Sequence, residues 1–334
     1  MSLLKTQSKK TKKESILMLV LVGILLLVVF LSLLVGASSA SAIDAFKALI
    51  NKDYQNSSFS IVFYLRLPRV LGGVFAGIAL AVAGGCLQAL LHNSMVAPNV
   101  IGVNSGAGFA VILVMAIFPS LISVMPLIAF IGALFTTLLI YYISKKSNQL
   151  SVILVGIAIS SILSAGINAV KVLFPNVVYD ISEYLIGGLS SVNYNTLVPS
   201  VSVIIIVLTI VLILRKNLDI LALGDDVATS LGLNVKKNHL LFLVCASALA
   251  GAAVSYAGLI GFIGLLVPHL ARSLIGGSYK KVIPFSALLG AILLTFADLI
   301  SRLIFMPYEL PVGILLSLIG GPFFIFLILI RRKS

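Results

Sequence analysis

The chain is a series of long apolar segments separated by short polar ones. Ten of these segments reach, or nearly reach, the roughly 20 residues that a helix needs to cross a bilayer. They are residues 16–36, 61–90, 100–118, 121–143, 150–174, 196–215, 238–257, 259–272, 282–304 and 311–330. The runs are continuous, unlike the short alternating strands of a membrane β-barrel. We therefore expect an all-α membrane protein with ten transmembrane helices.

Composition supports this class. Of the 334 residues, 60% are hydrophobic and only 10% are charged, which excludes a soluble domain of this length. The first apolar run follows a lysine-rich start and is too long for a signal peptide. We expect a cytoplasmic basic tail over residues 1–15, a single transmembrane domain over 16–330, and a cytoplasmic tail over 331–334.

The positive charges fix the expected topology. If the N-terminus is cytoplasmic, only six of the 23 lysines and arginines lie on the outer side, as the positive-inside rule requires. Both termini are then cytoplasmic. The formal charge of +13 reflects this topology, so we expect membrane lipid and not nucleic acid as a partner.

The polar loop 217–235 interrupts the apolar pattern. Its segment LALGDDVATSLGL places Asp225 and Asp226 directly after Gly224 and has a second glycine at Gly232. This pattern predicts a short helix with an acidic first turn and a glycine stop. Leucine and valine recur at fourfold spacing on it, at Leu223, Val227 and Leu231. Such an exposed apolar face is either a docking surface that a soluble partner grips or part of a solvated connector between two spans.

Three arginines depart from the positive-inside pattern. Arg66 and Arg69 flank Pro68 at the outer mouth of the second segment, and Arg302 lies at the outer end of the ninth. Arginine forks match carboxylates, so these residues favour docking of an acidic partner or substrate. The alternatives are snorkelling to lipid headgroups and an internal pair such as Asp298–Arg302.

The fifth segment carries a small polar stripe. Gly156, Ser160, Ser164 and Asn168 recur every four residues on one helix face. Such stripes either pack helices together or line a water-filled path. After this segment, Asp180 and Glu183 are expected on a short interfacial helix that ends at Gly187 and Gly188. Farther along, Gly320, Gly321 and Pro322 are expected to interrupt the tenth helix.

Several kinds of chemistry have no support. The chain has no G-x-x-x-x-G-K-S/T phosphate loop, no H-E-x-x-H motif and no nucleophile elbow. Cys86 and Cys245 lie within apolar segments, and His92 has no second ligand nearby, so no metal site or catalytic residue is expected. Asp298 is almost alone as an intramembrane acid, which disfavours a proton relay. If the protein pumps anything, the energy must come from elsewhere, and the polar loop could receive force from a separate ATPase.

Four motifs, in order, resemble the FecCD-type permeases over residues 16–330. They are RLPRVLGGVFAGIALAVAGGCLQALLHNSMVAPNVIGVNSGAG, LALGDDVATSLGL, GLIGFIGLLVPHLAR and ADLISRL followed by ELPVG. The resemblance implies a type II ABC importer permease fold in the bacterial cytoplasmic membrane. It also implies a second permease subunit, identical or closely related, with the path between the two. Two cytoplasmic ATPase subunits would bind ATP and magnesium, and an extracytoplasmic substrate-binding protein would cap the outer side; this chain itself would hold no cofactor.

The resemblance also assigns roles to residues. It makes Gly224, Asp225, Asp226, Ala228, Leu231 and Gly232 a coupling helix for the ATPase, and Arg66, Arg69 and Arg302 pockets for the binding protein's glutamates. The cytoplasmic gate would be Asn93 and Met95, with Gln149 and Leu150 near a second gate. The family often has proline and leucine where Ser94 and Met95 stand here, so the gate differs in composition.

The expected function is import of an iron–siderophore complex by the permease subunit of an ATP-driven importer. Haem and vitamin B12 are the alternative cargoes within the same fold. A secondary transporter driven by an ion gradient, and a structural or sensory membrane protein, are the alternatives from other classes. The scarcity of intramembrane acids argues against the ion-driven transporter.

Overall fold

The computed structural model describes residues 2–36, 41–51, 53, 56–99, 102–144, 149–306 and 308–331. Within these ranges all regular structure is helical. The long helices are α1 (Ser2–Leu34), α4 (Leu67–Leu90), α6 (Met125–Ser144), α7 (Gln149–Leu173), α9 (Tyr194–Leu221), α11 (Val235–Ala257), α13 (Tyr279–Leu303) and α14 (Val312–Arg331). Two helices of intermediate length are α5 (Val103–Ile117) and α12 (Ile263–Ile275). The short elements are α2 (Ala42–Ile50), α3 (Ser57–Ser60), η1 (Ile61–Arg66), η2 (Pro119–Val124), η3 (Pro175–Val177), α8 (Val178–Ile186) and α10 (Asp225–Ser230).

The helices follow the apolar segments of the sequence. Seven described segments are long and apolar enough to cross a membrane: Lys13–Leu34, Ser57–Leu90, Met125–Ile143, Leu154–Leu173, Tyr194–Leu221, Val235–Ala257 and Tyr279–Leu303. Three shorter apolar segments are Val103–Ile117, Ile263–Ile275 and Val312–Phe326. Together they coincide with the ten expected segments. The structure therefore shows a multi-pass helical membrane protein, and the crossing of the bilayer by the three shorter helices stays a prediction.

Helices α4 and α11 form the centre of the bundle. Helix α4 packs against α13, α11, α12 and α9, and α11 also contacts α6 and α5. Both are rich in alanine and glycine and are buried along most of their length. Small residues allow this close packing in a membrane, where helices associate through van der Waals contact. A Cβ atom at Gly77 on α4 would overlap the backbone carbonyl of Gly290 on α13.

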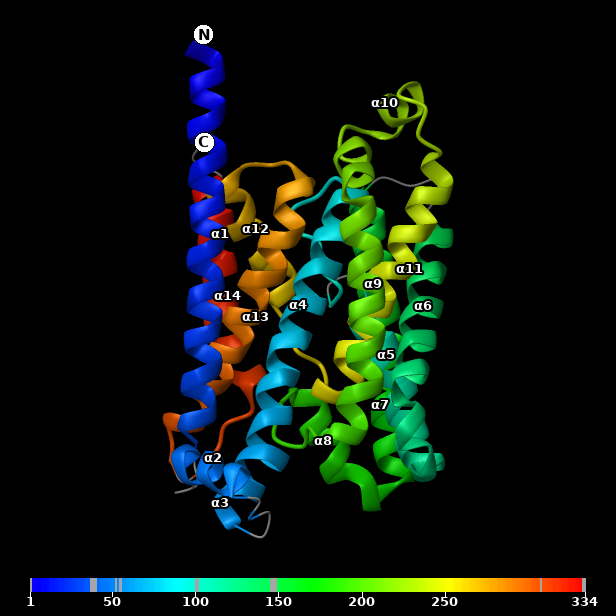
Figure 1. Ribbon diagram of the computed structural model, residues 1–334. Helices are drawn as coiled ribbons and strands as arrows, with labels where there is room; N and C mark the ends of the chain where they lie inside the picture. The colour runs from blue at the N-terminus through cyan, green and yellow to red at the C-terminus, as the bar shows by residue number, and fades with distance from the viewer. Residues whose placement is uncertain are drawn as a thin grey trace.

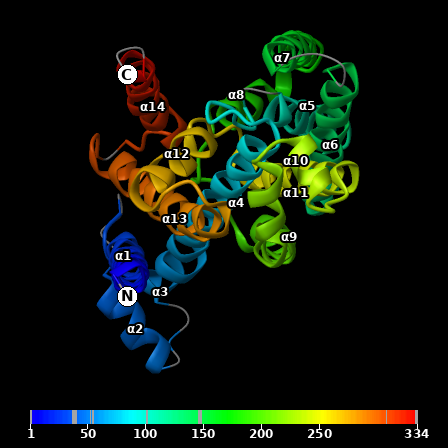
Figure 2. The same cartoon turned by 90° about the horizontal axis from the view of Figure 1, so that it is seen from above.

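The bundle has two distinct ends (Figure 1). Helix α1 begins, and α14 ends, at the end that carries α10, while α2, α3 and α8 lie at the other end. We call these the α10 end and the α8 end. Viewed along the bundle, α7 and α14 stand at the rim on one side, and α8 lies between them (Figure 2). The same view places α2 and α3 beyond the body of the bundle, close to α1.

The expected interruption of the tenth helix is wrong. Helix α14 runs through Gly320, Gly321 and Pro322 without a break. A proline inside a membrane helix removes one backbone donor without ending the helix, because local adjustments satisfy the freed carbonyl. Gly320 has a packing role instead, because a Cβ there would overlap the ring of Phe262.

Candidate functional site

The polar loop near residue 225 forms the helix that its sequence predicts. Helix α10 spans Asp225–Ser230, begins after Gly224 at φ 106° and is followed by Gly232 at φ 82°. Both glycines need positive φ, which residues with a Cβ rarely adopt. Asp225 and Asp226 occupy the first turn, where the helix dipole favours negative charge.

Helix α10 presents an apolar face outward. Leu223, Val227 and Leu231 are 61%, 45% and 60% exposed, whereas Ala228 is fully buried against the bundle. The Asp225 carboxylate lies 3.2 Å from Nε2 of His239 on α11. The helix is therefore held to the bundle on one side and leaves three large apolar side chains free on the other. This arrangement suits docking of a soluble partner better than it suits a solvated connector.

The arginines at the α8 end belong to a buried ionic cluster. Nε of Arg69 donates to both oxygens of Asp298, at 3.1 and 3.2 Å, and its Nη1 lies 2.5 Å from Oε2 of Glu309. Nε of Arg302 lies 3.2 Å from Oδ2 of the same aspartate. The internal Asp298–Arg302 pair considered from the sequence is thus confirmed.

Arg66 joins this cluster through the end of α1. Its Nη1 donates to the carbonyls of Leu33 and Leu34, at 3.0 Å each, and the residue is 5% exposed. Arg302 also reaches this helix end, donating to the Ser32 carbonyl at 3.2 Å. The last carbonyls of a helix lack partners within the helix, so cations at this end are favoured. Arg66 and Arg302 therefore hold the end of α1 against η1 and α13, while Arg69 links α4 to Asp298 on α13.

The turn after α4 contains the candidate gate residues. The Asn93 side chain accepts the backbone N–H of Met95 at 2.9 Å, and the Asn93 carbonyl accepts that of Val96 at 3.3 Å. The Val96 carbonyl accepts a hydrogen bond from the buried Gln88 amide at 3.0 Å. These bonds make the turn a compact unit at the α10 end of α4. Gln149 and Leu150 are the first residues of α7, and their side chains lie outside the described part of the structure.

The polar stripe of α7 lines an open groove. Ser160, Ser164 and Asn168 border a space of about 650 Å³ together with Asn99 from the segment before α5. Gly156, one turn from Ser160, lies against the backbone near Gly102. The hydroxyl of Ser160 has no hydrogen-bond partner in the described structure. The stripe therefore packs near Gly102 at Gly156 and Ser160, and it faces the accessible polar space at Ser164 and Asn168.

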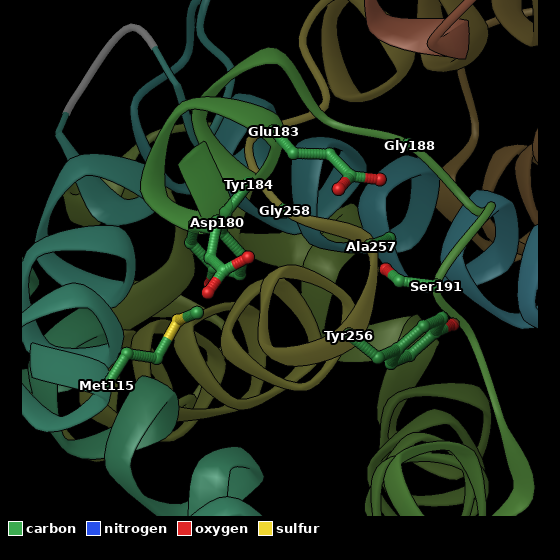
Figure 3. A pocket seen from close by; sticks show the side chains of 9 residues that line it. All are labelled: Met115, Asp180, Glu183, Tyr184, Gly188, Ser191, Tyr256, Ala257 and Gly258. Carbon is green, nitrogen blue, oxygen red and sulfur yellow. The ribbon is translucent and has the colours of Figure 1, made fainter. Parts of the chain in front are cut away.

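A second cavity lies beside α8 and was not foreseen as a pocket (Figure 3). Its volume is about 240 Å³, and Asp180, Glu183, Tyr256 and Met115 border it from three helices. The expected short helix bearing both carboxylates is confirmed, and it ends at Gly187 with φ 78°. Tyr184, in the next position, donates its hydroxyl to the Val254 carbonyl at 2.7 Å, and burial raises the pKa of this phenol.

On its other side, α8 borders a third cavity of about 270 Å³. Glu183 and Glu309 line it with Arg69. Among the side chains of this cluster, Glu309 is 31% exposed and Arg69 only 12%, so a partner approaching this surface meets carboxylate before guanidinium. Sequence reasoning missed the part played by Glu309, although its place in ELPVG beside the ninth segment was a signal.

Comparisons with known proteins agree over nearly the whole chain. The FecCD transport family matches residues 9–330. The Fe(3+)-citrate import system permease protein YfmD of Bacillus subtilis is 37% identical over 96% of this chain and 97% of its own length. The hemin transport system permease protein HmuU of Yersinia pestis is 36% identical over 92% of this chain and 95% of its own.

A solved structure shares the fold. It shows an inward-facing conformation of a metal-chelate type ABC transporter, with a TM-score of 0.82 and 28% identity over 93% of this chain and 98% of that one. The helical bundle, the motifs and the relatives lead to one conclusion: the chain belongs to the FecCD transport family and is a permease subunit, not an enzyme.

Proposed function

We propose that this chain is the permease subunit of an ATP-driven importer that carries a ferric chelate, of the siderophore type, across the bacterial cytoplasmic membrane. The observation that carries the proposal is the open polar groove along α7. Serine and asparagine side chains facing lipid would be costly, because lipid offers them no hydrogen bonds. A groove of this kind is stable where a second subunit and water cover it.

The second subunit in this proposal is an identical or closely related permease. Helices α7 and α14 stand at the rim on one side of the bundle, and both expose large apolar residues, including Leu154 and Ile162 on α7 and Leu318 on α14. Pairing two such faces would enclose the groove. The path residues Gly156, Ser160, Ser164 and Asn168 would then line the channel between subunits.

The other partners are proposed from the two ends of the bundle. A cytoplasmic ATPase, binding ATP and magnesium, would grip α10 through its exposed apolar face. If the chain spans the membrane ten times with both termini in the cytoplasm, α10 lies on the cytoplasmic side, where it can contact the ATPase. An extracytoplasmic binding protein would dock acidic groups at Arg66, Arg69 and Arg302. Asn93, Met95, Gln149 and Leu150 would close the path on the cytoplasmic side.

Uptake by iron-starved cells tests the proposal. Cells that lack this chain, and have no redundant system, are given labelled ferric siderophore, ferric citrate, haem or cobalamin. We expect loss of ferric-chelate uptake alone, and its recovery with the wild-type chain. Loss of haem uptake alone would keep the architecture and change the cargo, a result that the similarity to HmuU makes worth testing. Unchanged uptake of all four would refute the importer.

A further inference from the structure

Helix α9 ends where the coupling loop begins, and its last carbonyl has two partners. The Leu221 oxygen accepts the backbone N–H of Gly224, the residue that starts α10, at 3.0 Å. Nε2 of His92 lies 2.7 Å from the same oxygen. Because a carbonyl only accepts, this ring nitrogen carries the proton and donates. One backbone oxygen thus joins the start of α10 to the turn that follows α4.

The turn on the His92 side is joined by hydrogen bonds within it and to the end of α4. His92 N–H donates to the Ala89 carbonyl at 3.4 Å, and Asn93 N–H donates to that of Gln88 at 3.2 Å. Asn93 in turn fixes Met95 and Val96 through its side chain and carbonyl. A displacement of the His92 ring therefore reaches Asn93 and Met95 through a short run of hydrogen bonds.

His92 adopts an unusual backbone conformation. Its φ is +47°, and Phe262 is the other described non-glycine residue with positive φ. This left-handed conformation costs energy for a residue with a Cβ and persists where surrounding contacts hold it. The imidazole bond to Leu221 is one such contact, because it spans two elements 129 positions apart in the sequence.

The remaining polar contacts at this end hold other elements in place. The Asp219 carboxylate accepts from the backbone N–H groups of Tyr279 and Lys280 and from the Ser278 hydroxyl, which fixes the end of α9 to the start of α13. The Gln88 amide donates to the Gly264 carbonyl at 3.3 Å and accepts from Arg272. These contacts anchor α9 at Asp219 and α4 at Gln88, so Leu221 and His92 both lie just beyond the anchored positions.

We propose that His92 is a positioning residue that passes movement of the coupling loop to the gate turn at Asn93 and Met95. The inference rests on the proposed function, since it needs an ATPase that moves α10. The coupling depends on the N–H donor of the His92 ring. When α10 shifts, Leu221 shifts with it and pulls the turn after α4 through the His92–Leu221 hydrogen bond. A side chain at position 92 without this donor should still allow α10 to move, but the movement should no longer reach the gate turn.

Thiol labelling of the gate turn tests this inference independently of cargo. The transporter is purified through a tag on this chain carrying Met95→Cys, and modification by a membrane-impermeant maleimide is timed with and without ATP and magnesium. The native Cys86 and Cys245 are buried, and the protein without Met95→Cys gives their background. We expect ATP to change the labelling rate, and His92→Phe to reduce that change about fivefold, the effect of losing one hydrogen bond.

Two further variants separate the donor from the backbone. His92→Asn tolerates positive φ but its amide is too short to reach Leu221, so it should behave like His92→Phe. His92→Gln has a longer amide donor and should restore most of the ATP-dependent change. ATPase recovery and activity with the purified chain should be the same in all variants, which excludes misfolding and failed assembly.

The outcomes distinguish the inference from the proposed function. An ATP-dependent change that is the same in His92→Phe and the wild type would overturn the inference alone. Equal loss in His92→Gln and His92→Phe would also overturn it, since a restored donor would then not restore the ATP-dependent change. Purification without any ATPase would instead refute the importer on which the inference rests.

Discussion

Asp298 and Arg302 form a buried ion pair one turn apart on α13, with 3.2 Å between the Arg302 Nε and an Asp298 oxygen and 2% exposure of both side chains. The same carboxylate also accepts two hydrogen bonds from Arg69 on α4. One aspartate thus pairs with two guanidinium groups from different helices. The contact between Arg69 and Asp298 therefore fixes the relative position of α4 and α13 at the α8 end.

We predict that Asp298→Ala destabilises the protein by about 3–5 kcal/mol. Removing one member of a buried ion pair leaves the remaining charge without compensation. Here Arg302 loses its carboxylate partner, whereas Arg69 keeps Glu309. Thermal unfolding of the detergent-purified chain measures the loss. Asp180→Ala, which removes an exposed carboxylate at the same end, is the matched control and should leave the unfolding temperature unchanged. Equal stability of the two variants would contradict the interpretation.

Glu309 is the carboxylate of this cluster that an incoming acidic group could displace from Arg69, because it is the more exposed of the two. It is 31% exposed, and its carboxylate lies 2.5 Å from Arg69. We predict that Glu309→Gln tightens docking of the binding protein about tenfold, because an incoming carboxylate no longer competes for Arg69. Arg69→Gln should weaken docking by a similar factor. Titration of the binding protein onto the purified transporter measures both, and weaker docking in Glu309→Gln would show that this residue supports the docked state.

The exposed face of α10 should matter for assembly and not for folding. We predict that Leu231→Glu lowers the amount of ATPase that co-purifies with this chain about tenfold, because a charge replaces an apolar contact at the proposed interface. Its unfolding temperature should not change, since Leu231 is 60% exposed. Lys236→Gln, an exposed change in the first turn of α11, is the control. Normal ATPase recovery with Leu231→Glu would exclude this face as the contact.

The close contact between Gly77 on α4 and Gly290 on α13 gives a prediction about helix packing. We predict that Gly77→Ala destabilises the protein by about 1–3 kcal/mol, because the added methyl would overlap the Gly290 carbonyl and force α4 from α13. Gly321→Ala on α14 is the matched control, since a Cβ there meets no other atom within 4 Å. Because alanine favours a helix more than glycine does, Gly321→Ala should not lower the stability of the protein. Thermal unfolding of both variants should separate them clearly.

Much of the fold follows from local sequence properties. The length of the apolar runs predicted every long helix, because a segment in lipid must form its backbone hydrogen bonds within itself. Glycines at 187, 224 and 232 predicted where α8 and α10 begin or end, because those positions need positive φ. The Pro322 expectation failed because a proline rule drawn from water-exposed helices was applied to a membrane helix.

The sequence by itself determined the membrane class, the number of apolar segments, the short helix in the polar loop and the residues able to carry charge. Only the tertiary structure decided which of those residues meet. It placed Arg69 between Asp298 and Glu309, turned the α7 stripe toward an open groove, and brought His92 to Leu221 across 129 positions. The physical reason is that helix formation depends on neighbours along the chain, whereas ion pairs and grooves depend on how distant helices pack.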